Sequence, residues 1–128
     1  MIPKVLIALA NATEAAEYRS RLSELNYSVF WVNGAIDCAE HIRKYDLSIL
    51  ILDLDLPWGS GWGIINLMRE GELPNVPTVL LVNNITEDHP AEKADRLILR
   101  KPFQVADVID AVENLYLHYF NESSLTYV

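Results

Sequence analysis

Five short apolar segments alternate with segments of helical periodicity along the 128-residue chain. Continuous apolar runs of this kind are typical of strands that are buried on both faces of a sheet. Strands joined through helices form right-handed crossovers and therefore run parallel. We expect strands at Lys4–Leu9, Tyr27–Val32, Leu47–Leu52, Thr78–Val82 and Arg96–Leu99.

The segments between these strands carry apolar residues at helical spacing. The connection Asn83–Asp95 is too polar and too short for a full helix, so we expect at most one turn there, around Ala91–Ala94. The expected fold is α/β: a flavodoxin-like three-layer sandwich whose five-stranded parallel sheet has the order 2-1-3-4-5, with helices on both faces and the fourth helix shortened. Helices are expected at Ala12–Leu25, Ala35–Tyr45, Trp62–Arg69 and Val105–Tyr119.

Length, charge and cysteine content limit the classes of protein to consider. The chain is long enough for one domain, which we place at residues 1–120, followed by a C-terminal tail at residues 121–128. A formal net charge of −8 argues against binding to nucleic acid or to anionic membranes and favours a protein partner with basic residues. The single cysteine, Cys38, excludes a disulfide within the chain, and no apolar run is long enough to span a membrane, so we expect a cytoplasmic protein.

Two charged residues stand where the predicted strands end. In an open parallel sheet, ligands bind beyond the carboxyl ends of the strands, at the point where the strand order reverses. Asp53 follows the most apolar run, and Lys101 follows the last run. A carboxylate nucleophile beside an ammonium group is suited to phosphate transfer, but a salt bridge that closes the top of the sheet explains the same pair. The residues alone leave both interpretations open.

Two motifs resemble those of response-regulator receiver domains. The segment Leu50–Gly61 is similar to the receiver signature, in which the phosphoacceptor aspartate stands four residues before a proline and eight before a glycine, as Asp53 does here. The segment Arg100–Phe103 is similar to the Lys-Pro-Phe sequence that follows the fifth strand of receivers. The resemblance extends over Lys4–Tyr119 and identifies the chain as receiver-like.

The resemblance implies roles for four residues. Asp53 takes the phosphoacceptor position, and Lys101 takes the position that pairs with the phosphoryl group. Asp55 takes the place whose backbone carbonyl helps to bind magnesium, so Asp53 and Asp55 are the metal ligands to consider. Pro102 is the candidate for a cis-proline.

Four other positions depart from the receiver pattern. Receivers carry an acidic pair after the first strand, where this chain has Leu9 and Ala10. The hydroxyl residue that ends the fourth strand is Val82 here, and the switch aromatic of the fifth strand is Ile98. Because magnesium needs several oxygen ligands to offset its dehydration, we expect weak magnesium binding at most and no resident cofactor.

We therefore interpret the chain as an atypical, degenerate receiver domain, a pseudo-receiver of the two-component signalling type. It is not expected to be an enzyme, and its partner is expected to be a histidine kinase or a downstream effector. The expected surface is the face formed by the fourth helix, fifth strand and fifth helix, and a homodimer is also considered. The alternative is a functional phosphoacceptor domain that a histidine kinase phosphorylates on Asp53.

A phosphatase is a less favoured alternative. Asp53-Leu54-Asp55 resembles the Asp-x-Asp motif of haloacid-dehalogenase-type phosphatases, in which the first aspartate is also phosphorylated. However, no acidic pair ends a later strand, and the chain has little room for a cap domain.

Two tryptophans border the loop after Asp53. Trp62 is expected to pack against the core as part of a helix. Trp58 stands in the loop itself, where a large apolar side chain is costly unless it is covered, so it predicts either a surface for a partner or a lid over Asp53.

Overall fold

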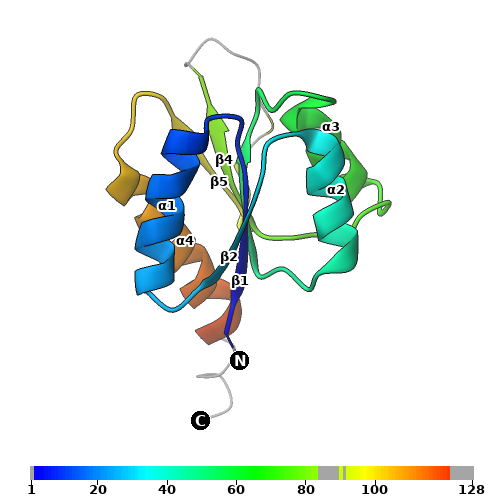
Figure 1. The fold of residues 1–128 in the computed structure, drawn as a ribbon. Helices are drawn as coiled ribbons and strands as arrows, with labels where there is room; N and C mark the ends of the chain where they lie inside the picture. The colour runs from blue at the N-terminus through cyan, green and yellow to red at the C-terminus, as the bar shows by residue number, and fades with distance from the viewer. Residues whose placement is uncertain (1, 84–89, 91, 122–128) are drawn as a thin grey trace.

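The computed structural model describes residues 2–83, 90 and 92–121, in which strands and helices alternate along the chain (Figure 1). The elements are β1 (Lys4–Ala8), α1 (Ala12–Glu24), β2 (Ser28–Val32), α2 (Ala35–Lys44), β3 (Ile49–Asp53), α3 (Ser60–Arg69), β4 (Thr78–Val82), β5 (Arg96–Arg100), α4 (Val105–Tyr116) and the π-helical turn η1 (Leu117–Asn121).

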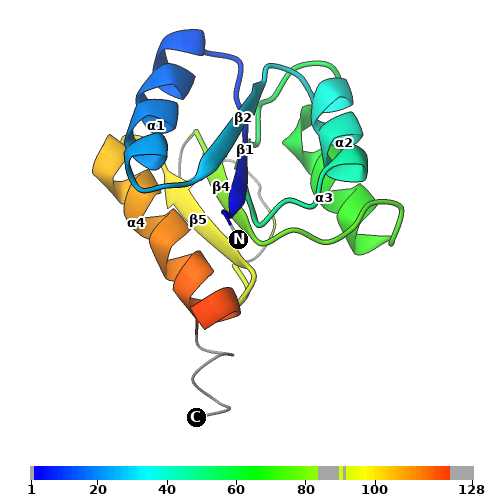
Figure 2. The same cartoon turned by 60° about the horizontal axis from the view of Figure 1, so that its bottom comes forward.

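The five strands form one parallel sheet of order β2-β1-β3-β4-β5. Helices α1 and α4 pack against each other on one face of the sheet, and α2 and α3 pack against each other on the opposite face (Figures 1 and 2). The predicted fold class and strand order are therefore confirmed. Within the described residues, no helix is both long and apolar enough to cross a membrane.

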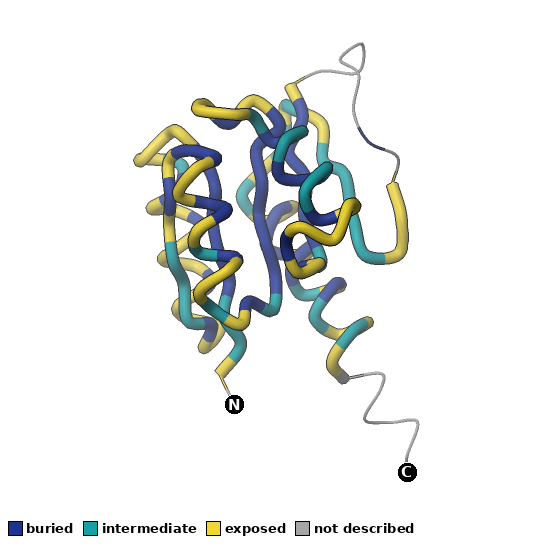
Figure 3. The backbone as a smooth tube through the Cα atoms, turned by 90° about the vertical axis from the view of Figure 1, so that its right-hand side faces the viewer, coloured by how far each residue is buried: buried dark blue, intermediate teal, exposed yellow. Residues whose placement is uncertain are grey.

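The sheet separates two apolar cores. Every residue of β3 and β4 is buried, whereas most residues of the edge strands β2 and β5 are partly exposed (Figure 3). Because successive side chains of a strand point to opposite faces, Ile49 and Ile51 of β3 enter the core under α1 and α4, and Leu50 and Leu52 enter the core under α2 and α3. This two-sided burial explains why the strand sequences lack polar alternation.

The start of α3 differs from its prediction, because the helix begins at Ser60 and not at Trp62. Trp58, Gly59 and Ser60 have φ angles of 62°, 119° and 66°, so the chain reverses over these residues and enters the helix directly. Of these three residues, only Gly59 adopts a positive φ without strain. The residue types at positions 58 and 60 therefore did not predict the turn or the start of the helix at Ser60. The predicted packing of Trp62 is confirmed, since it lies against the core under α2 and α3.

The connection from β4 to β5 is only partly described. Residues 84–89 and Ala91, with which the predicted helical turn begins, lie outside the described residues. The residues that follow form a tight turn in which Lys93 and Arg96 exchange two backbone hydrogen bonds of 3.0 Å. Next to this turn, the Glu92 carboxylate accepts a hydrogen bond of 3.0 Å from the backbone N–H of Ile98 in β5. Residues 122–128 also lie outside the described residues, so the boundary between domain and tail stays a prediction.

Two glycines of α3 should respond in opposite ways to alanine substitution. A Cβ atom at Gly61 would lie 2.6 Å from the backbone oxygen of Asp53, whereas a Cβ at Gly63 meets no atom within 4 Å. We expect Gly61→Ala to lower the free energy of unfolding by about 1–3 kcal/mol, because backbone atoms cannot yield as a side chain can. Gly63→Ala should raise it by about 0.5–1 kcal/mol through helix propensity. Urea denaturation of the two variants checks this pair, and equal effects would contradict the packing.

Cys38 provides a test of core integrity. Its side chain is fully buried in α2, and burial raises the pKa of the thiol to about 12. A raised pKa keeps the sulfur protonated, and the thiolate is the reactive form. We expect the folded protein to resist Ellman's reagent at about pH 8, with reaction only at the rate of unfolding. Fast labelling without denaturant would show that α2 opens locally.

Candidate functional site

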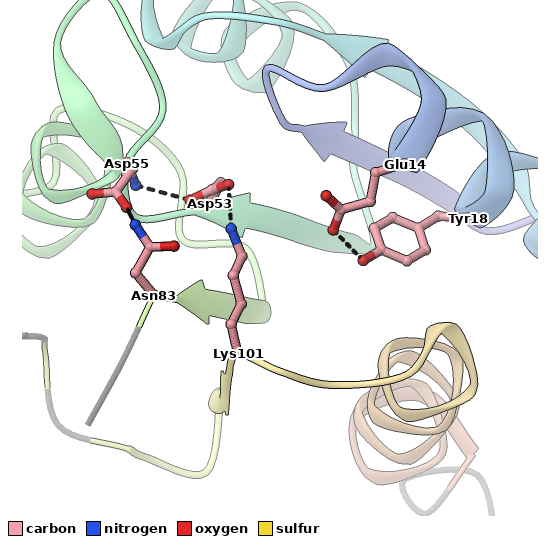
Figure 4. A network of polar contacts seen from close by, with 6 residues as sticks. All are labelled: Glu14, Tyr18, Asp53, Asp55, Asn83 and Lys101. Carbon is pink, nitrogen blue, oxygen red and sulfur yellow. Dashed lines mark hydrogen bonds and ion pairs between the residues drawn. The ribbon is translucent and has the colours of Figure 1, made fainter.

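Asp53 and Lys101 meet at the carboxyl ends of the strands. Asp53 is the last residue of β3, and its side chain is only 11% exposed. Lys101 directly follows β5 and is fixed there because its backbone N–H donates to the carbonyl oxygen of Val82 over 2.9 Å. The Lys101 ammonium lies 3.6 Å from Oδ2 of Asp53, so the pair forms an ion pair that closes the top of the sheet (Figure 4). The peptide bond between Lys101 and Pro102 is cis.

The second oxygen of Asp53 is held by the loop that follows β3. The backbone N–H of Asp55 donates to Oδ1 of Asp53 over 2.9 Å. The side-chain carboxylate of Asp55 in turn accepts a hydrogen bond from the side-chain amide of Asn83, which follows β4 (Figure 4). The carboxylate of Asp53 thus has one oxygen bound to the loop and the other directed to Lys101, and this fixes its orientation.

The end of β1 contributes no charge to this site. The side chain of Leu9 is buried in the core under α1 and α4, and the methyl group of Ala10 is exposed. The carbonyl oxygen of Leu9 accepts a hydrogen bond of 2.8 Å from the indole N–H of Trp31 in β2. The first strand therefore ends in an apolar side chain and a methyl group at the place where the strand order reverses.

The other two positions that depart from the receiver pattern, Val82 and Ile98, also lie in apolar surroundings. Val82 is fully buried in the core under α2 and α3, and Ile98 packs partly buried against the same core. Neither side chain has a hydrogen-bonding group to offer to an anion bound at Asp53.

A second polar pair near the site comes from α1. The buried hydroxyl of Tyr18 donates a hydrogen bond of 2.5 Å to the carboxylate of Glu14. Burial, this hydrogen bond and the negative charges of Glu14, Glu17 and Asp53 all raise the pKa of Tyr18. Figure 4 shows the pair on the α1 side of Lys101. The sequence analysis gave Tyr18 no polar role; the available signal was a glutamate one helical turn before this tyrosine.

The oxygen donors around Asp53 do not fit a magnesium site. Magnesium requires an octahedral set of oxygen ligands, of which carboxylates supply the charge. Over residues 2–83, 90 and 92–121, no group of three or more Asp, Glu, His or Cys side chains gathers to hold a metal ion. Asp53 and Asp55 offer two carboxylates, of which the first lies beside Lys101 and the second accepts a hydrogen bond from Asn83.

Comparisons with known proteins identify the fold. No family model matches the sequence. The signal receiver domain of a protein from Vibrio parahaemolyticus superposes with a TM-score of 0.78 and 19% identity, over 97% of this chain and 98% of that chain. The chain has the receiver-domain fold. A response regulator receiver protein from Sinorhizobium medicae (TM-score 0.73, 24% identity, 89% of this chain and 94% of that chain) has the same fold, as does the CheY-like receiver domain of Methylobacillus flagellatus (0.72, 19%, 90% and 99%).

The match confirms the receiver-like fold that Leu50–Gly61 and Arg100–Phe103 indicated. Identities below 25% establish the fold alone, so the roles of Asp53 and Lys101 depend on the geometry of this chain.

The ion pair should show measurable coupling. We expect a double-mutant cycle of Asp53→Asn and Lys101→Met to give a coupling free energy of about 1 kcal/mol, the upper end for pairs that remain open to solvent. Asparagine keeps an oxygen that can accept the N–H of Asp55, so the cycle isolates the charge. Chemical denaturation at low and high salt measures the term, which should shrink at high salt. Strict additivity of the two substitutions would refute the pair.

Proposed function

We propose that this chain is an atypical receiver domain that acts through protein–protein interaction, with weak or absent magnesium-dependent phosphorylation of Asp53. The observation that carries the proposal is the apolar end of β1, where Leu9 and Ala10 supply no carboxylate beside Asp53.

Phosphoryl transfer depends on charge neutralisation and positioning, and a metal ion that bridges the moving oxygens supplies much of both. The carboxylate of Asp53, with a lysine 3.6 Å away, is half of a balanced pair and attracts a divalent cation poorly. Asp53 therefore serves as one half of a structural ion pair in this proposal, and Lys101 as the other half.

The apolar switch positions support the same conclusion. A hydroxyl at the end of β4 would donate to a phosphoryl oxygen, but Val82 has no donor and is fully buried. Ile98 has no aromatic ring that relocates. A ligand shifts a conformational equilibrium only through contacts that differ between the two states. Without such contacts, the domain keeps one conformation and binds its partner constitutively.

The proposed partner is a histidine kinase or a downstream effector, and the proposed setting is the cytoplasm, which the single buried thiol of Cys38 supports. The expected surface was the fourth helix, fifth strand and fifth helix of a receiver. In the described part of this chain, that face consists of β5 and of α4, the helix that follows β5 and stands for the fifth helix of a receiver. A second copy of the chain is the other partner considered for this surface.

One observation favours the alternative of a functional phosphoacceptor. Asp53 keeps its place at the end of β3, and Lys101 keeps its place within reach of the carboxylate. A phosphoryl group on Asp53 would find the lysine that neutralises it.

The two functions predict different products with a small phosphodonor. We expect little or no phosphoryl adduct by intact mass after incubation with acetyl phosphate and magnesium, because the donor set binds the metal weakly at most. Asp53→Asn is the control for any adduct. A wild-type adduct that disappears in Asp53→Asn would establish the phosphoacceptor alternative, and turnover of p-nitrophenyl phosphate would establish the phosphatase.

Ala10→Asp is the matching gain-of-function variant. Ala10 is exposed, so a carboxylate there remains solvated and the fold should tolerate it. We expect tighter magnesium binding in calorimetric titration, since a second carboxylate joins Asp53. The wild-type protein should give no binding heat under the same conditions, and equal affinities would show that the end of β1 is not the limiting feature.

A further inference from the structure

The outer strand β2 carries no residue of the kind that keeps other strands away. β2 and β5 are the two outer strands of the sheet. β5 has Arg96 and Arg100 at its ends, whereas β2 (Ser28–Val32) contains neither a charged residue nor a proline. Proteins usually protect a sheet edge with such residues. The unprotected edge of β2 therefore indicates a place where another strand can pair.

The hydrogen bonds of β2 show which backbone groups face outward. At the two ends of the strand, Ser28 donates a hydrogen bond of 2.9 Å to the residue before β1, and Val32 accepts one of 3.0 Å from the residue after β1. Alternate residues of a strand turn their backbone groups to the same side, so those of Val29 and Trp31 point away from β1. Within residues 2–83, 90 and 92–121, no hydrogen bond reaches these outward groups. Figures 1 and 2 show β2 between α1 and α2.

A hollow of about 150 Å³ lies between β2 and α1. Ala12, Ala15 and Ala16 line it from α1, and Trp31 lines it from β2. The indole of Trp31 is held in place because its N–H donates to the carbonyl oxygen of Leu9 over 2.8 Å. A strand paired with β2 would turn every second side chain toward α1, and the hollow has room for one aliphatic side chain among them.

Arg19 gives this hollow a positive charge. It is exposed, and it forms no ion pair within the described part of the chain. No acidic residue stands three or four positions away along α1, where helical side chains meet. The acidic residues of α1 (Glu14, Glu17 and Glu24) stand more than about 120° round the helix axis from the centre of the hollow. The hollow therefore presents an uncompensated cation to whatever covers it.

Aromatic rings lie beside β2 on the opposite face of the sheet. Phe30 stacks on Tyr45 with 4.8 Å between the ring centroids, and the His41 ring of α2 lies 5.4 Å from that of Tyr45. All three side chains are partly exposed. Helix α2 carries two acidic and two basic residues, so this side selects no charge. An added strand would find apolar surface on both of its faces and a preference for negative charge on one.

We propose that the edge of β2 binds an extended segment of a protein partner, which adds a sixth strand and carries an aliphatic and an acidic side chain on the α1 side. Its backbone pairs with the outward groups of Val29 and Trp31, as in other complexes formed by strand addition. The aliphatic side chain enters the hollow. The acidic side chain, two residues away on the same face of the added strand, pairs with Arg19.

A second copy of the chain fits this edge less well. Its β2 has no acidic residue to place beside Arg19, and its β5 would bring Arg96 or Arg100 there. Two copies also repel each other, because each has a formal charge of −8. The charges thus favour a strand from a different protein. This surface lies at the other end of the sheet from β5 and so goes beyond the partner face of the proposed function.

Two synthetic peptides test the proposal on the full chain. One contains Glu-Val-Val-Val-Glu and the other Lys-Val-Val-Val-Lys. The central valine faces the hollow, and a charge on each side of it reaches Arg19 whichever way the peptide runs. We expect the glutamate peptide to bind about tenfold more tightly than the lysine peptide. The net charge of the chain attracts the lysine peptide, so this preference reports the local charge of Arg19.

Hydrogen exchange distinguishes strand addition from other modes of binding. At a peptide concentration of about ten times Kd, only about a tenth of the edge stays free, so the amides of Val29 and Trp31 should exchange about tenfold more slowly. The amide of Phe30 is turned toward β1 and should keep its rate. Heteronuclear NMR spectra measure the three amides separately.

A charge reversal locates the acidic contact. Arg19→Glu should reverse the preference, so that the lysine peptide binds more tightly than the glutamate peptide. Arg21→Glu is the matched control, because Arg21 is also an exposed arginine of α1 but stands about 200° round the helix axis from Arg19. It should leave the preference of the wild type in place.

Several results would overturn the proposal. These are a lack of binding by either peptide, equal affinities, an unchanged preference in Arg19→Glu, or unprotected amides of Val29 and Trp31 in the bound state. Protection of the same amides that rises with protein concentration without any peptide would show instead that a second copy of the chain occupies the edge. None of these results depends on whether Asp53 accepts phosphate.

Discussion

The burial of β3 is the constraint from which the rest of this structure follows. All five residues of the strand are buried between β1 and β4, and the last of them is a carboxylic acid. A carboxylate with so little access to water needs partners for its charge and its lone pairs. The N–H of Asp55 and the ammonium of Lys101 supply them from two separate loops. The ion pair therefore joins the end of β3 to the connection after β5, and the single ammonium of Lys101 balances the charge of Asp53 because β1 adds no acid beside it.

Much of this arrangement could be predicted from the sequence. Apolar runs fixed the strands to within one or two residues, and the residues at their ends indicated Asp53 and Lys101, because parallel strands bring their carboxyl ends to one edge. The positive φ of Trp58 and Ser60 could not be predicted, since neither residue type favours it. The hydrogen bond of Asn83 to Asp55 depends on how the loops after β3 and β4 sit on the sheet, which spacing along the chain does not determine. The hydrogen bond of Tyr18 to Glu14 joins residues one helical turn apart, so the spacing already allowed it.

The receiver-domain fold separates two properties that signalling receivers combine. The scaffold needs only apolar strands, packed helices and an oriented Asp53, all of which this chain has. Phosphate-driven switching needs in addition a metal site, a hydroxyl and a ring that moves, at positions that are apolar here. Apolar residues at these positions do not disturb the scaffold, because Leu9 and Val82 extend the cores on either side of the sheet. Under the proposed function, the chain gains packing at the positions where it gives up regulation.

The contact between Glu92 and β5 has a further consequence. An outermost strand presents backbone amides on which a foreign strand can add, and natural proteins guard such edges with charge. Here a carboxylate already occupies the amide of Ile98. An approaching strand would have to displace it and would bring its own carbonyl oxygens against a negative group. The side chain thereby guards one position of this edge against the addition of a foreign strand.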